Sequence, residues 1–168
     1  MGVGPLVGWH TMWFQYVTGE TGDATLEPGR QVFSADEYAH MADVRRVFGA
    51  FRIAAASAAI LGSVLILGVA LRRRRAAVLL IRDAGLAAAI GVAAIAIAAV
   101  VAFDPLFLVF HEVFFPQGNF LFGPESNLLA VYPDQYWYGV ALRIGLTFVA
   151  AMAVVGLAAT ATLRHARR

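Results

Sequence analysis

The sequence predicts an all-α membrane protein, organised as a single integral membrane domain over residues 1–168. Hydrophobic residues make up 60% of the chain and charged residues only 14%, whereas a soluble domain has about 25% charged residues. The charges are clustered, and three uncharged stretches between them reach the roughly 20 residues that a helix needs to cross a bilayer. The chain has no cysteine, which excludes disulfides and thiolate chemistry.

The uncharged stretches define the predicted transmembrane helices. We expect these helices near Phe51–Leu71, Ala84–Phe103 and Trp137–Leu163. The helix that contains the first span is expected to begin earlier, at Ala35, because Ser34 and Glu37 form the S-x-x-E pattern of a capping box. Residues 1–16 are apolar and aromatic but too short to span, so we expect an interfacial segment there. Thr18–Arg30 is rich in glycine and acidic residues and is predicted to be a loop.

Arginine placement predicts the orientation of the spans. Of the 13 basic residues, eight lie on one side of the three spans, namely Arg72, Arg73, Arg74, Arg75, Arg82, Arg164, Arg167 and Arg168. By the positive-inside rule this side faces the cytoplasm. All the acidic residues except Asp83 fall on the opposite side. We therefore expect the residues before Ile53 and the segment Asp104–Trp137 to lie outside the cytoplasm.

The segment Asp104–Trp137 is unusually aromatic for a connection between two spans. Eleven of the 20 aromatic residues lie between Phe103 and Tyr138. The same segment contains carboxylates, amides and a histidine, which lipid would leave without hydrogen-bond partners. Aromatic rings with polar neighbours are favoured at the membrane–water boundary. The sequence therefore predicts a re-entrant or interfacial extracytoplasmic segment here.

Two histidines are the candidate centre of the chemistry. His40 and His111 are both expected on the extracytoplasmic face, each close to the end of a span, and we expect them to converge on one polar cavity. Imidazole is the side chain whose ordinary pKa lies near neutrality, which suits a general acid or base. Structural roles, with hydrogen bonds to backbone carbonyls, stay open for both. His10 and His165 are expected to have no chemical role.

Three stretches together are similar to a known family. They are SADEYAHMADVRRVF at Ser34–Phe48, FHEVFFPQGNFLF at Phe110–Phe122 and LLAVYPDQYW at Leu128–Trp137. They resemble the signature stretches of the lipoprotein intramolecular transacylase (Lit) family of bacterial integral membrane proteins. In that family a first transmembrane helix precedes these stretches, and we expect it to be missing from this chain.

The resemblance implies an activity, a substrate and a location. The enzyme would move the sn-2 acyl chain of a diacylglyceryl-modified lipoprotein onto the amine of its own N-terminal cysteine. The matching histidines, His40 and His111, would be catalytic, at the extracytoplasmic face of the bacterial plasma membrane. The partners would be the modified lipoprotein N-terminus and membrane lipid, with no nucleic acid. Ester-to-amide transfer is downhill, so no cofactor or metal is expected.

Several residues are candidates for supporting this chemistry. Asp43 is one helical turn from His40, and Glu112 is next to His111, so either carboxylate is a candidate to orient a histidine. Asn119 is a candidate oxyanion donor. Two other functions stay open: a non-catalytic membrane scaffold, and a metal-dependent hydrolase in which Asp43 or Glu112 joins the histidines. No G-x-S-x-G motif supports a serine hydrolase, and no glycine-rich loop supports nucleotide binding.

Overall fold

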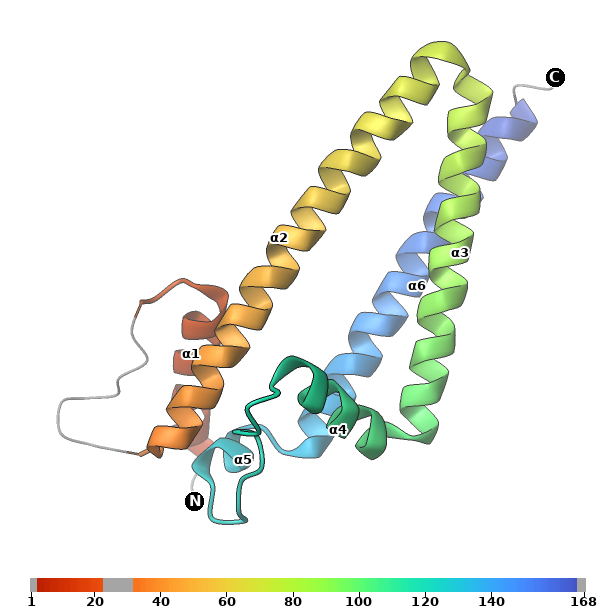
Figure 1. The fold of residues 1–168 in the computed structure, drawn as a ribbon. Coiled ribbons are helices and arrows are strands. Elements are labelled where there is room, and N and C mark those ends of the chain that lie inside the picture. Colours follow the sequence, from red (N-terminus) through yellow and green to blue (C-terminus); the bar gives the residue numbers. More distant parts are fainter. Residues whose placement is uncertain (1–2, 23–31, 166–168) are drawn as a thin grey trace. The chain divides into compact units, whose positions relative to one another are not determined.

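The structure is a computed structural model that describes residues 3–22 and 32–165, and it contains helices but no strand in these ranges (Figure 1). The helices are α1 (Val3–Thr18), α2 (Ala35–Arg72), α3 (Arg74–Val101), α4 (Phe103–Phe114), α5 (Asn127–Val131) and α6 (Asp134–His165). Within the described ranges, α2, α3 and α6 are long and apolar enough to cross a membrane. The predicted all-α fold with three spans is therefore confirmed.

The boundaries of the spanning helices differ from those of the uncharged stretches. Only Arg73 separates α2 from α3, so α3 begins ahead of the predicted Ala84 and includes the charged pair Arg82 and Asp83. The third spanning helix likewise begins at Asp134, ahead of the predicted Trp137. Charged residues limit how much of a helix can lie in lipid, but arginine is a good helix former and does not end the helix itself.

The predicted capping box is formed at the start of α2. The backbone N–H of Ser34 donates to Glu37 Oε2 at 2.6 Å, and the backbone N–H of Glu37 donates to Ser34 Oγ at 3.2 Å. These bonds satisfy two of the donors that a helix N-terminus leaves unpaired. The helix consequently begins at Ala35, as the sequence predicts.

The chain divides into two compact units. The first, which we call the aromatic unit, comprises Met1–Ala55 and Asp104–Trp137. The second, which we call the span unit, comprises Ala56–Phe103 and Tyr138–Arg168. The aromatic unit contains the beginning of α2 and the first residues of α6, and the span unit contains the remainder of both helices together with all of α3.

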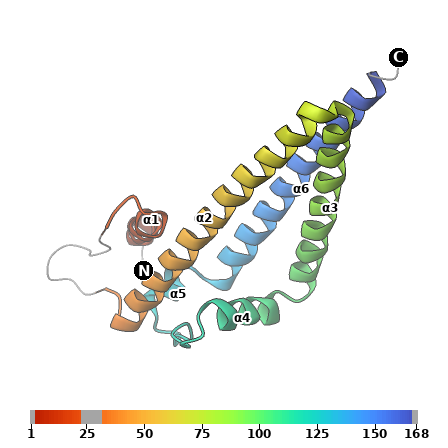
Figure 2. The same ribbon diagram turned by 45° about the horizontal axis from the view of Figure 1, so that its top comes forward.

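Helices α3 and α6 pack antiparallel in the span unit, where both views show them side by side (Figures 1 and 2). Small residues allow the close approach. A Cβ atom added to Gly85 would lie 3.9 Å from Val155 Cγ1, and one added to Gly145 would lie 3.5 Å from Ala96 Cβ. Small residues at such contacts are typical of helix packing in membranes.

Helix α1 contributes to the core of the aromatic unit. Its Trp13 is 0% exposed, and Trp13 and Val17 pack in one cluster with Phe33, Met41, Leu128 and Tyr132. The sequence predicted only an interfacial segment here. One face of α1 is instead buried in protein, while Val7 and Phe14 on the helix remain 58% and 53% exposed. The interfacial placement of that exposed face stays a prediction.

Two arginines of α2 attach the end of α1. Arg52 Nη1 donates to the carbonyl oxygen of Thr18 at 2.6 Å, and Arg45 Nη1 donates to that of Thr21 at 2.9 Å. The Arg45 guanidinium also lies over the Tyr16 ring, 4.7 Å from its centroid. Cations are favourable at helix C-termini, where carbonyl groups lack partners. These contacts give a structural reason for arginines on the predicted outer side.

Candidate functional site

The two candidate histidines lie next to each other in the aromatic unit. His40 comes from the second turn of α2 and His111 from the end of α4. Their ring centroids are 6.0 Å apart and their planes are inclined by 18°, so the rings are stacked. His40 is buried, with 7% of its surface exposed, and His111 is partly buried. The structure thus brings together the two histidines that the sequence predicted to converge.

Aromatic rings surround the pair. Phe115 lies 4.8 Å and Phe122 lies 5.5 Å from the His40 ring, measured between centroids. Phe107 and Phe120 lie 4.3 Å and 5.1 Å from the His111 ring. The sequence predicted a polar cavity at this point, whereas the neighbours of the pair are mainly aromatic. The immediate surroundings of the two imidazoles are therefore largely apolar.

A backbone contact fixes the tautomer of His111. Its Nδ1 lies 2.8 Å from the carbonyl oxygen of Phe107, one turn earlier in α4. A carbonyl oxygen only accepts hydrogen bonds, so Nδ1 must carry a proton and donate it. In the neutral ring the lone pair therefore lies on Nε2. That nitrogen is the one able to take up or release a proton.

The surroundings of His40 favour its neutral form. His40 precedes the apolar section of α2 that begins at Ile53, so it lies outside the membrane-spanning segment. Burial lowers the pKa of His40 most, the charge of His111 lowers it further, and a hydrogen bond with the Asn119 side chain raises it, leaving a pKa of about 4 in place of the usual 6.5. His40 is therefore uncharged at neutral pH.

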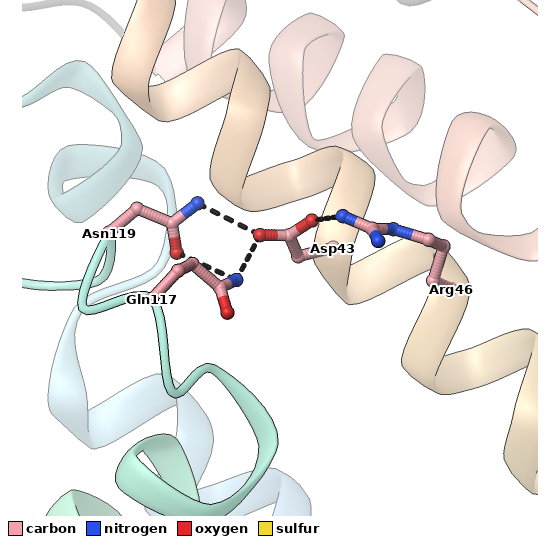
Figure 3. Close-up of polar contacts among 4 residues, drawn as sticks. All are labelled: Asp43, Arg46, Gln117 and Asn119. Atoms are coloured by element: carbon pink, nitrogen blue, oxygen red, sulfur yellow. Dashed lines mark hydrogen bonds and ion pairs between the residues drawn. The ribbon is translucent and has the colours of Figure 1, made fainter.

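Asp43 contacts the turn after α4 instead of His40 (Figure 3). Its Oδ2 accepts hydrogen bonds from Gln117 Nε2 and, at 2.9 Å, from Asn119 Nδ2, while its Oδ1 pairs with Arg46. Asp43 was a candidate to orient His40, but among the described residues its carboxylate forms no hydrogen bond with that ring.

A comparison with protein families identifies the chain. The model of the family described as lipoprotein intramolecular transacylase Lit matches residues 10–137, which is most of the 168 residues. The chain belongs to the Lit family. No curated protein and no solved structure matches it.

The Lit match contains the complete histidine site. His40, Asp43, His111 and Asn119 all lie within residues 10–137 and within the aromatic unit. Glu112 also lies within the match, but it is exposed and forms no hydrogen bond or ion pair with any described residue. The structure therefore brings four of the five predicted site residues together and leaves Glu112 apart from them.

The two histidines without an expected role lie elsewhere. The His10 ring packs against Tyr132 and Tyr136, with centroids 5.5 Å and 5.7 Å away. His165 is exposed at the end of α6, where its Nδ1 lies 2.8 Å from the carbonyl oxygen of Ala161.

Within the described residues no group of three or more His, Cys, Asp or Glu side chains is arranged to hold a metal ion.

Two further residues of the Lit match shape the site and were not predicted to do so. Gln117 joins Asp43 to Asn119, because its amide also donates to Asn119 Oδ1 at 3.2 Å. Glu37, expected only to cap α2, also accepts hydrogen bonds at Oε1 from Ser126 Oγ at 2.5 Å and from the Leu128 backbone N–H at 2.8 Å. The only local signal for either role is the Gln117-Gly118-Asn119 sequence, which is typical of a turn.

The carboxylate of Glu37 therefore joins two helix starts. It is 3% exposed, and it binds the N-termini of both α2 and α5. Burial raises the pKa of Glu37, but hydrogen bonds with Ser126, Leu128 and Ser34 lower it by more, so the pKa lies below its usual value. The ionised carboxylate thus fixes the segment that follows α4 against the start of α2.

Proposed function

We propose that this chain is a membrane O-to-N acyltransferase that acts on diacylglyceryl-modified lipoproteins. It moves the sn-2 acyl chain onto the α-amino group of the same N-terminal cysteine and yields the lyso-form lipoprotein. His40 and His111 are its acid–base pair. The observation that supports this most strongly is the stacked pair itself, with ring centroids 6.0 Å apart, in a chain that belongs to the Lit family.

The reaction needs proton transfer in two directions. The amine nitrogen attacks the ester carbonyl carbon, the new C–N bond forms, and the bond from that carbon to the glycerol oxygen breaks. One proton leaves the amine and one arrives on the glycerol oxygen, so no net proton is consumed. Two imidazoles meet this need without an acyl-enzyme intermediate. Because donor and acceptor are on one molecule, much of the entropic barrier is already removed.

The surroundings of each histidine suit a part of this transfer. His40 is uncharged at neutral pH because its pKa is about 4, so a ring nitrogen with a lone pair is present to accept a hydrogen bond from the attacking amine. His111 presents Nε2, since its Nδ1 donates to Phe107. The aromatic side chains around both rings keep water from competing for the ester. Asn119 binds Asp43, which follows His40 by one turn of α2, and it retains one N–H for the oxyanion of the tetrahedral intermediate.

The proposed location is the outer face of a bacterial plasma membrane. Three helices are long and apolar enough to span, and the arginines cluster where α2 meets α3 and where α6 ends. The aromatic unit, which contains the histidines, would then lie outside the cytoplasm, where a mature lipoprotein N-terminus is found. Exposed apolar side chains of α4, such as Val109 and Val113, suit contact with lipid.

The test uses bacteria whose lipoproteins are diacylated. The chemical structure of a lipoprotein N-terminus is determined in cells that express this chain and in cells that do not. Transfer within one molecule leaves the mass unchanged, so fragmentation by mass spectrometry must locate the acyl chain on nitrogen or on glycerol. We expect N-acylated, monoacylglyceryl cysteine only in expressing cells. Unchanged lipoproteins in cells that contain the folded protein would contradict the proposal and favour a non-catalytic scaffold.

A further inference from the structure

The histidine that the proposed reaction needs is closed off from its surroundings. His40 is only 7% exposed and its Nδ1 is buried, yet a catalytic imidazole must come within hydrogen-bond reach of the proton that it moves. We propose that residues 119–122, which we call the strap, open as a lid to admit the acyl ester to His40. This inference deepens the proposed function and rests on it for one of its two tests.

The strap contacts both histidines through aromatic rings. The ring centroid of Phe122 lies 5.5 Å from that of His40, and the ring centroid of Phe120 lies 5.1 Å from that of His111. The other phenylalanine next to His40 is Phe115, whose backbone N–H donates to the carbonyl oxygen of His111 at 2.7 Å and so continues α4. The strap is therefore the part of these surroundings that can move while α2 and α4 stay folded.

The backbone of the strap is weakly held. Residues 115–126 form no helix, and no backbone–backbone hydrogen bond joins any of residues 119–122 to another described residue. A glycine lies at each end, Gly118 with φ of 78° and Gly123. Segments with few backbone hydrogen bonds open locally at a lower free-energy cost than the whole fold, and glycine permits the change in backbone angles. The strap has both properties.

One polar anchor fastens the strap to α2. Asn119 Nδ2 donates to Asp43 Oδ2 at 2.9 Å, and Gln117, which precedes the strap, donates to the same oxygen (Figure 3). Asp43 is buried and lies one turn after His40, so the anchor is close to the ring that the strap covers. Leu121, within the strap, is 77% exposed and does not help to hold it closed. Opening therefore requires the bond between Asn119 and Asp43 to break.

The first test is independent of activity and uses maleimide labelling of the whole protein in detergent micelles, since the chain has no cysteine of its own. His40→Cys places a thiol next to the strap. Met41→Cys is the matched control, because Met41 is the next residue, is 6% exposed and packs in the cluster around Trp13. Each rate is divided by the rate of the same thiol in the denatured protein. We expect His40→Cys to react at least about tenfold faster than Met41→Cys, because local opening costs less than unfolding.

The anchor is tested by adding Asn119→Ala to each labelled protein, a change that leaves the net charge as it is. A hydrogen bond to a charged group shifts the balance between closed and open forms by about tenfold or more, so His40→Cys should react faster by that factor. Met41→Cys should change by less than about twofold, because its cluster stays folded. Leu121→Ala, which alters the strap but not the anchor, should leave both rates nearly unchanged.

Three results would overturn the inference. Equal labelling of His40→Cys and Met41→Cys would mean that the site becomes accessible only when the core unfolds. Equal acceleration of the two thiols by Asn119→Ala would mean that Asn119 stabilises the whole unit, and no acceleration of either would mean that it is no anchor. Where Asn119→Ala does not fold, Gln117→Ala replaces it, since Gln117 is exposed and donates to the same oxygen of Asp43.

The second test locks the strap and measures transacylation. Asp43→Cys combined with Asn119→Cys places two thiols where the native side chains meet at 2.9 Å. A short bifunctional methanethiosulfonate joins the thiols, whereas methyl methanethiosulfonate caps each without joining them. We expect the joined protein to react at least about tenfold more slowly than the capped protein, and a reductant to reverse the difference.

The outcomes of the two tests separate the strap from the proposed function. Equal transacylation by the joined and the capped protein would contradict a lid. A folded wild type without transacylase activity would contradict the proposed function, and the labelling of His40→Cys against Met41→Cys would still decide whether the strap opens.

Discussion

Three buried polar side chains share one face of α2. Glu37, His40 and Asp43 follow one another at three-residue spacing and are 3%, 7% and 7% exposed. Each has its partners in the segment 104–137: Glu37 in the α5 N-terminus, His40 in the histidine pair, and Asp43 in the turn after α4. Buried polar groups destabilise a fold unless they are paired. The chemistry and the folding of the aromatic unit therefore depend on the same helix face.

The low pKa of His40 makes stability depend on pH. The folded protein holds this pKa at about 4, against 6.5 when the ring is exposed. Between these values the unfolded chain binds a proton that the folded chain does not, so stability falls as the pH drops below about 6.5, by up to about 3 kcal/mol. We expect the thermal unfolding midpoint in detergent to fall on acidification from about pH 7.5 to about pH 5, and to fall less in His40→Gln. Equal shifts in the two proteins would contradict this assignment.

At the scale of elements, α1 is predicted to be part of the folded core. Trp13 is fully buried between rings, with centroids 5.1 Å from Phe33 and 5.2 Å from Tyr38. Trp13→Ala should lower the free energy of unfolding by about 3–5 kcal/mol. Trp13→Phe should lower it by less, because a ring is retained and the indole Nε1, which is buried without a partner among the described residues, is removed.

A substitution on the exposed face of α1 is the control for the Trp13 variants. The stability of all these variants is measured as the midpoint of unfolding in detergent. Phe14 is 53% exposed, so Phe14→Ala should leave the midpoint nearly unchanged. If Phe14→Ala destabilised the protein as much as Trp13→Ala, the packing of α1 described above would be wrong.

Elements set by local patterns were predictable, and those set by distant contacts were not. The start of α2 follows from Ser34 and Glu37, which are three residues apart, and the spans follow from uncharged length. The packing of α1 depends on Phe33, Leu128 and other residues far along the chain, and nothing in residues 1–16 alone indicates those contacts. The helical range of α3 also exceeded its uncharged stretch because arginine continues a helix.

At the scale of the whole molecule, part of the site followed from topology. The arginine asymmetry and the span ends predicted that His40 and His111 would lie on one membrane face, and the structure places their rings 6.0 Å apart. The Asp43–Gln117–Asn119 bonds and the second role of Glu37 join residues more than 70 positions apart. Such pairings depend on tertiary packing, which neither periodicity nor spacing reports.

The membrane orientation is testable because the chain has no cysteine. A single cysteine at Arg75, near the turn between α2 and α3, should react with an impermeant maleimide only after the cells are permeabilised. Gln135 is exposed at the start of α6. A single cysteine at this position should react while the cytoplasmic membrane is intact, in cells whose outer layers let the maleimide through. The arginine asymmetry gives this expectation. Labelling of Arg75→Cys in intact cells would contradict the orientation.

The most direct test of the account is the rate at which the purified protein converts a diacylglyceryl lipopeptide whose sn-1 and sn-2 chains differ in length. We expect the wild type to place only the sn-2 chain on the amine. His40→Ala and His111→Ala should each lose about a hundredfold or more in rate, the usual size of an acid–base contribution, while His10→Ala and His165→Ala should stay near the wild type. A wild-type rate of transfer in either His40→Ala or His111→Ala would contradict catalysis by the histidine pair.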